Sequence, residues 1–267
     1  MGISGEPFAA SFSPFGFLPL LLKGFEPPKE PFDPNGEWAL TYRLFVVGVI
    51  AEKYRQWGCV PSGTLQVKRA PMRDGTFILQ VNLVSNQSIE HHGRGIDRIE
   101  AEVTHRNDSW ASILSWRRVS WLLTQKRQLV TAEVLGIDAE DLELGIKLEM
   151  SGRVENGQIV LKIGSRERKI KAPSPLTCDW ALIDVVQRMA QRGDKRLNFA
   201  VLEELEFLRK NQRLVLREPM EIEVDGRKFR WHRIEQFGDG VLPWTYCLDE
   251  HHRLILAFSA MRAIVLA

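Results

Sequence analysis

The stretch that decides the fold class is LEMSGRVENGQIVLKI, residues 148–163. It contains two runs in which apolar and polar side chains alternate, and Glu155-Asn156-Gly157 separates them. An Asn-Gly pair between alternating runs is the strongest short-range signal for a β-hairpin, because both residues accept the positive φ angles of a tight turn. We therefore predict a hairpin with strands over 142–154 and 158–163.

The same order of strand, turn and strand recurs on both sides of this hairpin. Upstream, alternating runs cover 64–69, 76–84 and 97–105, with a turn around Asp74-Gly75. Downstream, such runs cover 227–237, 241–248, 254–258 and 261–266, with turns at 238–240 and 249–252. Repeated short strands with turn residues between them indicate a mostly antiparallel sheet.

Two stretches have helical spacing instead. In residues 178–190 the apolar side chains are Leu182, Ile183, Val186 and Met189, and Thr177 can cap the helix. In residues 199–210 they are Phe199, Leu202, Leu205 and Leu208, and Asn198 can cap the helix. We predict an α+β fold in which two or three helices cover one face of a large antiparallel sheet.

The first 36 residues differ in composition from the rest. Seven of the thirteen prolines lie here, which forbids a long helix or an interior strand. The same segment contains six phenylalanines: Phe8, Phe12, Phe15, Phe17, Phe25 and Phe32. We predict that residues 1–36 are an extended arm that packs on the domain surface or on a partner subunit. Residues 37–267 are then one β-rich domain with a helical insertion near 177–210.

Composition narrows the functional classes. The chain has 267 residues, of which 44% are hydrophobic and 26% charged, and its formal charge is +2. This balance argues against a protein whose main task is neutralising nucleic-acid phosphates. The longest apolar runs are far shorter than the roughly 20 residues of a spanning helix, so no transmembrane segment is expected. Without a basic n-region before the first apolar run, we predict a cytoplasmic protein, or an exported one if a leader was removed.

The C-terminal sequence FGDGVLPWTYCLDE, residues 237–250, is followed by two short strands. It resembles the end of uncharacterised bacterial proteins that are similar to the lipoprotein-localisation-factor (LolA-like) fold. The Gly63–Val67 strand, the Asp74-Gly75 turn and the Ile99–Val103 strand fit the same outline. The resemblance implies a large curved sheet, an open half-barrel that wraps helices, with a concave and partly apolar face. Members of this family include carriers of lipid-like groups and at least one small-molecule pathway enzyme.

Aromatic residues are the main candidates for ligand binding. The chain has eight tryptophans, and their large apolar rings with a single donor suit pockets as well as cores. Trp116, Trp231, Trp244 and Tyr246 lie in predicted strands, where they can line the concave face or pack in the core.

Polar candidates for catalysis lie on the strand over 97–105. His105 continues the apolar face of Ile99, Ala101 and Val103, whereas Arg98, Glu100 and Glu102 face the other way. Glu90-His91-His92 and Glu250-His251-His252 lack established metal-ligand spacing, so we predict neither a metal nor another cofactor. The three cysteines, Cys59, Cys178 and Cys247, are interpreted as small buried hydrophobes.

These patterns favour a binding protein for a hydrophobic or aromatic small molecule held between sheet and helices. An alternative is an isomerase- or cyclase-type enzyme that uses the same cleft, with Arg98, Glu100, Glu102 and His105 as its polar residues. A third interpretation is a structural subunit of a larger assembly, in which the N-terminal arm forms a homo-oligomer contact.

Overall fold

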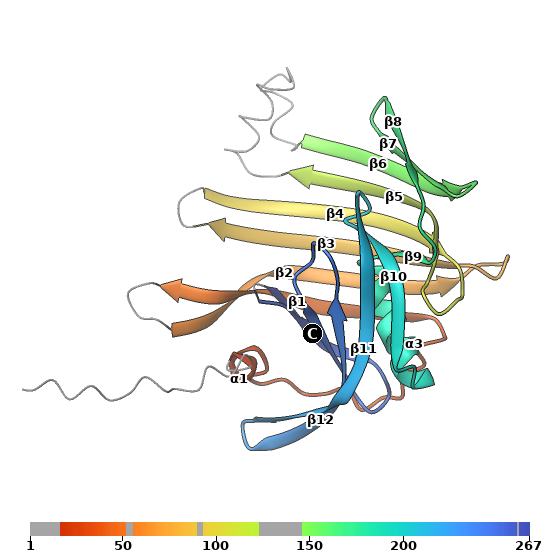
Figure 1. Cartoon of the computed structure of the whole chain (residues 1–267). Coiled ribbons are helices and arrows are strands. Elements are labelled where there is room, and N and C mark those ends of the chain that lie inside the picture. Colours follow the sequence, from red (N-terminus) through yellow and green to blue (C-terminus); the bar gives the residue numbers. More distant parts are fainter. Residues whose placement is uncertain (1–16, 52–55, 90–92, 123–145, 261) are drawn as a thin grey trace, which may run out of the picture.

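The computed structural model describes residues 17–51, 56–89, 93–122, 146–260 and 262–267. Its strands form a 15-stranded sheet in the order β8-β7-β6-β5-β4-β3-β2-β1-β15-β14-β13-β12-β11-β10-β9 (Figure 1). All neighbouring strands are antiparallel except β9 and β10, which are parallel. The mostly antiparallel, large curved sheet of the prediction is confirmed.

The first half of the sheet is a meander in which each strand pairs with the next along the chain. Its strands are β1 (Trp38–Ala51), β2 (Gln56–Pro71), β3 (Phe77–Ile89), β4 (Gly93–His105), β5 (Ile113–Leu122), β6 (Ile146–Glu155), β7 (Gln158–Ile163) and β8 (Arg166–Lys171). The predicted hairpin is present: Glu155 pairs with Gln158, and Asn156 and Gly157 have φ angles of 49° and 71°.

The second half runs from the opposite edge back to the middle of the sheet. Its strands are β9 (Leu176–Cys178), β10 (Arg196–Glu203), β11 (Phe207–Val224), β12 (Arg227–Phe237), β13 (Trp244–Leu248), β14 (Leu254–Phe258) and β15 (Arg262–Leu266). The last strand, β15, pairs with β1 and joins the two halves, so that Leu44 lies opposite Ile264.

The predicted helix over 199–210 is wrong. These residues form the β10–β11 hairpin, in which Glu203 pairs with Phe207. Its turn residues Glu204 and Leu205 have positive φ angles of 51° and 60°, as in a type I′ turn. The turn contains neither glycine nor asparagine, so the sequence gives no sign of a hairpin here. The spacing of the apolar residues is then compatible with a helix.

One long helix, α3 (Ala181–Arg192), occupies the inside of the curled sheet (Figure 1). Every residue from Ala181 to Ala190 is buried, and the helix ends at Gly193 in the left-handed conformation. The prediction placed this helix at 178–190, but its proposed cap Thr177 lies in β9 and donates to the Ala111 carbonyl at 3.4 Å. Strand β9, at one edge of the sheet, thereby rests against β5, the fourth strand from the opposite edge.

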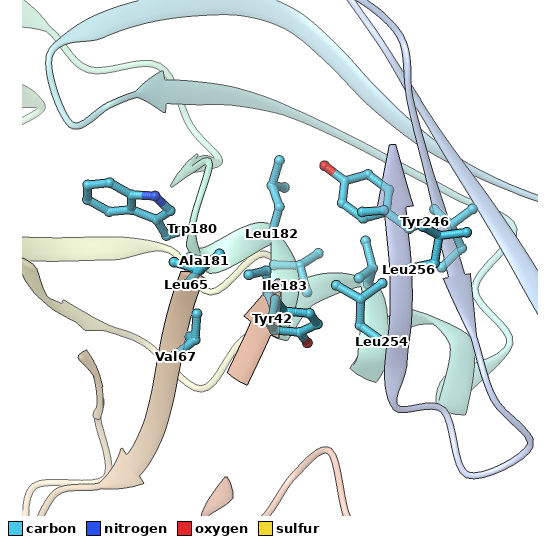
Figure 2. Close-up of a cluster of buried hydrophobic side chains, with 14 of the residues drawn as sticks. Tyr42, Leu65, Val67, Trp180, Ala181, Leu182, Ile183, Tyr246, Leu254 and Leu256 are labelled. Atoms are coloured by element: carbon cyan, nitrogen blue, oxygen red, sulfur yellow. The ribbon is translucent and has the colours of Figure 1, made fainter. Parts of the chain in front are cut away.

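The first turn of α3 enters the centre of the core (Figure 2). Ala181, Leu182 and Ile183 lie among Tyr42, Leu65 and Val67 of the first half and Tyr246, Leu254 and Leu256 of the second half. Both halves of the sheet therefore bury their apolar faces on the same helix. The predicted open space between sheet and helix is filled here by side chains.

The described part of the N-terminal arm packs on its own chain. It contains a one-turn helix, α1 (Leu18–Leu21), and then runs in extended form to Trp38. Phe17 contacts Phe258 edge-to-face at 5.4 Å between ring centroids, and Phe25 contacts Trp231 in the same way at 6.2 Å. Phe8, Phe12 and Phe15 lie outside the described residues. Among the helices that the structure describes, none is long and apolar enough to cross a membrane.

Candidate functional site

The four polar residues predicted for catalysis lie on two faces of β4. Arg98 and Glu100 are bonded to each other, and their side chains are 49% and 43% exposed. Glu102 is exposed and accepts a hydrogen bond from Gln80 Nε2 at 3.3 Å. His105 is fully buried on the other face, so the structure does not bring the four residues together.

His105 belongs to the core instead. Its Nδ1 lies 3.0 Å from the Arg106 carbonyl, and its ring stacks on Phe77 at 6.0 Å between centroids. Burial lowers the pKa of His105, although the nearby Asp184 carboxylate opposes this shift. A lowered pKa favours the neutral imidazole, and His105 lines neither of the two pockets described below. We therefore interpret His105 as a packing residue and not as a group that transfers protons.

A buried ionic cluster beside His105 connects the arm, the sheet and the helix. Asp184 Oδ2 accepts from Arg188 Nε at 3.0 Å and Nη2 at 2.6 Å, and Asp184 Oδ1 lies 2.9 Å from Arg69 Nε. Arg69 Nη1 donates to the Asn35 carbonyl at 2.7 Å, and Arg188 Nη1 donates to the Asp108 carbonyl at 2.6 Å. The two guanidinium groups share the Asp184 carboxylate, and backbone carbonyls accept their other N–H groups, so we interpret the cluster as a structural clamp.

Two of the predicted ligand-binding aromatics are core residues. Trp116 is buried over Gly152, where an added Cβ would lie 2.1 Å from the Trp116 Cζ2 atom. Tyr246 is buried, and its hydroxyl donates to Gln236 Oε1 at 2.8 Å. Trp244 is half-buried and stacks on Tyr246 at 6.4 Å between centroids. None of these three side chains lines the pockets described below.

Trp231, the fourth candidate, borders a pocket of about 630 Å³ that we call the arm–β12 pocket. Its walls are the arm, the first half of β12 and the turn after β13: Glu26, Pro27, Pro28, Lys29, Arg227, Lys228, Phe229, Arg230, Trp231, Asp249, Glu250 and His251. A smaller pocket of about 160 Å³ continues from it toward Leu22, Phe25 and Val224, and shares Phe229 with it. The combined space lies within the size range of small-molecule sites.

The arm forms one wall of this pocket because contacts with the rest of the chain fix it at both ends of the stiff Pro27-Pro28 segment. At the first arm residue of the pocket, Glu26 lies 3.7 Å from Arg227, at the start of β12. After it, the buried Arg253 donates to the Glu30 carbonyl, and its guanidinium lies 5.2 Å from the ring centroid of Phe32. Between these points Pro27-Pro28 keeps the chain extended, because proline fixes φ and donates no hydrogen bond.

The inner wall of the pocket is aromatic. Phe229 stacks on Trp231 at 5.4 Å between centroids, and Phe25 contacts both rings edge-to-face. The edge of β12 is also open here, since its pairing with β13 begins only at His232. Backbone donors and acceptors along Arg227–Trp231 therefore have no strand beside them on that side, within the described residues.

The arm and Trp231 were each singled out from the sequence, but their contact with each other was not predicted. The one relevant signal was that residues 1–36 combine many prolines with many phenylalanines, which indicates an extended segment whose apolar side chains pack on another surface. Pairing that segment with β12 requires contacts more than 200 residues apart, as in the hydrogen bond between Gly24 N–H and Asp225 Oδ2 at 3.4 Å.

The cysteines and histidines form no further site in the part of the chain that is described. Cys178 and Cys247 are buried, and burial raises the pKa of both thiols. His232 and His252 stack at 5.0 Å between centroids, and burial and the neighbouring His232 lower the pKa of His252. Residues 90–92, with the first acidic-histidine string, lie outside the described residues.

Comparisons with known proteins agree with the fold and give no activity. No family model and no curated protein sequence matches the chain. Among solved structures, the chain is similar to a β-barrel-like protein of domain of unknown function DUF1849 from Brucella abortus. The two share 11% identity over 86% of this chain and 94% of that one, with a TM-score of 0.54. At this identity the likeness shows a common curved β fold only.

Proposed function

We propose that the protein binds a small apolar or aromatic molecule in the arm–β12 pocket. The observation that carries this proposal is an aromatic wall of Phe229 and Trp231 beside a space of about 630 Å³, with Phe25 packed on both rings and lining the smaller pocket next to it. Aromatic side chains supply large contact area and little conformational freedom, which suits them to hold a flat or aliphatic guest.

This proposal moves the predicted guest from the space between sheet and helix to the space under the arm. Buried side chains fill the interior beside α3, whereas the Phe229 and Trp231 rings border the pocket that Pro27 and Pro28 help to form. The resemblance to the LolA-like family supports the same class of guest, because that family includes carriers of lipid-like groups.

The test is a titration with the neutral fluorescent probe N-phenyl-1-naphthylamine, whose emission rises in apolar surroundings. We expect saturable binding to one site, weakened about tenfold by Phe229→Ala, which corresponds to about 1.4 kcal/mol of lost contact. The matched control is Phe237→Ala, since Phe237 is also half-buried on β12 but lies outside the pocket, near Arg213 and Arg217. Absence of binding, or equal affinity in both variants, overturns the proposal.

A further inference from the structure

The charged rim of the arm–β12 pocket distinguishes among guests. Its basic residues are Lys29, Arg227, Lys228 and Arg230, and its acidic residues are Glu26, Asp249 and Glu250. The rim therefore has one more basic than acidic side chain. The charges that are free to bind a ligand are those of side chains without an ion-pair or hydrogen-bond partner in the protein.

Most of the acidic groups are already engaged. Glu26 pairs with Arg227 at 3.7 Å. Asp249 Oδ1 accepts the backbone N–H groups of His251 at 2.9 Å and Arg253 at 2.8 Å, and its carboxylate closes the turn after β13. Glu250 alone remains, with an 87% exposed side chain directed to solvent, 3.9 Å from His251 Nε2.

The basic groups of the rim are less engaged. Lys29, Lys228 and Arg230 are exposed, and none has an ion-pair partner among the described residues. Glu221 and Glu223 lie opposite Arg230 and Lys228 in the β11–β12 register, but no ion pair joins them in this part of the chain. Three cations without carboxylate partners thus line the same pocket as Phe229 and Trp231.

We infer that the guest of this pocket carries an anionic group, such as a carboxylate, sulfonate or phosphate, on its apolar or aromatic body. The anion lies against Lys29, Lys228 and Arg230, and the body lies on Phe229 and Trp231. Charge-assisted hydrogen bonds from lysine and arginine orient such a group, and the open edge of β12 offers further N–H donors. This inference rests on the proposed function, because it names the chemistry of the same guest.

The experiment compares two probes that share one ring system. N-phenyl-1-naphthylamine is neutral, and 8-anilinonaphthalene-1-sulfonate adds a single negative charge. We expect the sulfonate to bind at least about tenfold more tightly at low salt, and this preference to shrink at high salt, because screening weakens exposed charges.

The double variant Lys228→Gln/Arg230→Gln is expected to abolish the preference, because it weakens binding of the sulfonate at least about tenfold more than binding of the neutral probe. The matched control is Arg166→Gln/Arg168→Gln on β8, which removes the same charge at alternate positions of an exposed strand. Equal binding of the two probes by the wild type, or an unchanged preference in the pocket variant, overturns the inference and leaves the proposed function standing. If the neutral probe does not bind, the proposed function itself fails.

Discussion

Asp184 illustrates how much of the architecture depends on a single buried carboxylate. Its two oxygens lie within 3.0 Å of guanidinium nitrogens from Arg69 and Arg188, and all three side chains are almost completely buried. Removing the carboxylate leaves two buried cations without a counter-charge, and breaking a buried pair in this way costs about 3–5 kcal/mol. We expect Asp184→Ala to lose this much free energy of unfolding in urea. Glu155→Ala, which breaks the exposed pair with Arg153, should lose under about 1 kcal/mol. A loss of similar size in both variants would contradict the clamp.

Asp179 makes stability depend on pH. Its carboxylate accepts the N–H groups of Trp180 and Glu204, each at 3.0 Å, and burial raises its pKa from 3.8 to about 7. The folded state holds this proton more tightly than the unfolded chain does. Stability is therefore complete below the unfolded pKa and is lost as pH rises through about 7.

We expect the Tm of the wild type to decrease relative to that of Asp179→Asn as pH rises from about 5 to about 8, because only the wild type loses the stability linked to the Asp179 proton. The control is Asp74→Asn, because hydrogen bonds from Thr76 lower the pKa of Asp74 and keep it ionised throughout this range. Its slope of Tm against pH should equal that of the wild type. The interpretation fails if Asp179→Asn keeps the wild-type slope too.

At the scale of elements, the β5–β6 pair depends on one glycine. Gly152 lies opposite Trp116, and the indole ring covers it so closely that a methyl group has no room. Overpacking of this kind costs about 1–3 kcal/mol. We expect Gly152→Ala to lower the free energy of unfolding by that amount, measured in urea. Ser151→Ala, one residue away on the opposite face, should change it by less than about 0.5 kcal/mol. A neutral Gly152→Ala would mean that Trp116 moves easily and is no fixed part of the core.

Strands and helices differed in how well the sequence predicted them, for a physical reason. Asn156-Gly157 marks its hairpin because these residue types tolerate positive φ, and both predicted strands are present, although residues 142–145 of the first lie outside the described residues. Glu204-Leu205 adopts a similar turn without such residues, because Leu205 is buried and Asp179 holds the Glu204 N–H. The turn is thus stabilised by tertiary contacts that a local pattern does not contain, and the helical spacing of 199–210 was misleading.

At the scale of the whole molecule, the sequence does not indicate which distant segments contact each other. The alternation of side chains predicts which face of each strand is apolar, but not what covers it. Helix α3 covers the inner face of the sheet, and the N-terminal arm packs on the outer face of β12. Trp231 could therefore be selected from the sequence as an aromatic residue in a predicted strand, whereas no local pattern singled out the basic residues Lys228 and Arg230. Only the path of the arm places them at a pocket.

The curled sheet also makes its two terminal strands unequal, which amide hydrogen exchange can measure. Both β8 and β9 pair with one neighbour only, but β9 is buried against β5, whereas β8 is exposed along most of its length. Local opening is easiest where few apolar contacts must break, so β8 should exchange first. We expect peptides covering Arg166–Lys171 to exchange at least about tenfold faster than those covering Leu176–Cys178, with β14, buried at every position, the slowest. Equal rates at β8 and β9 would mean that the sheet does not close on itself, and the burial of α3 would then need another explanation.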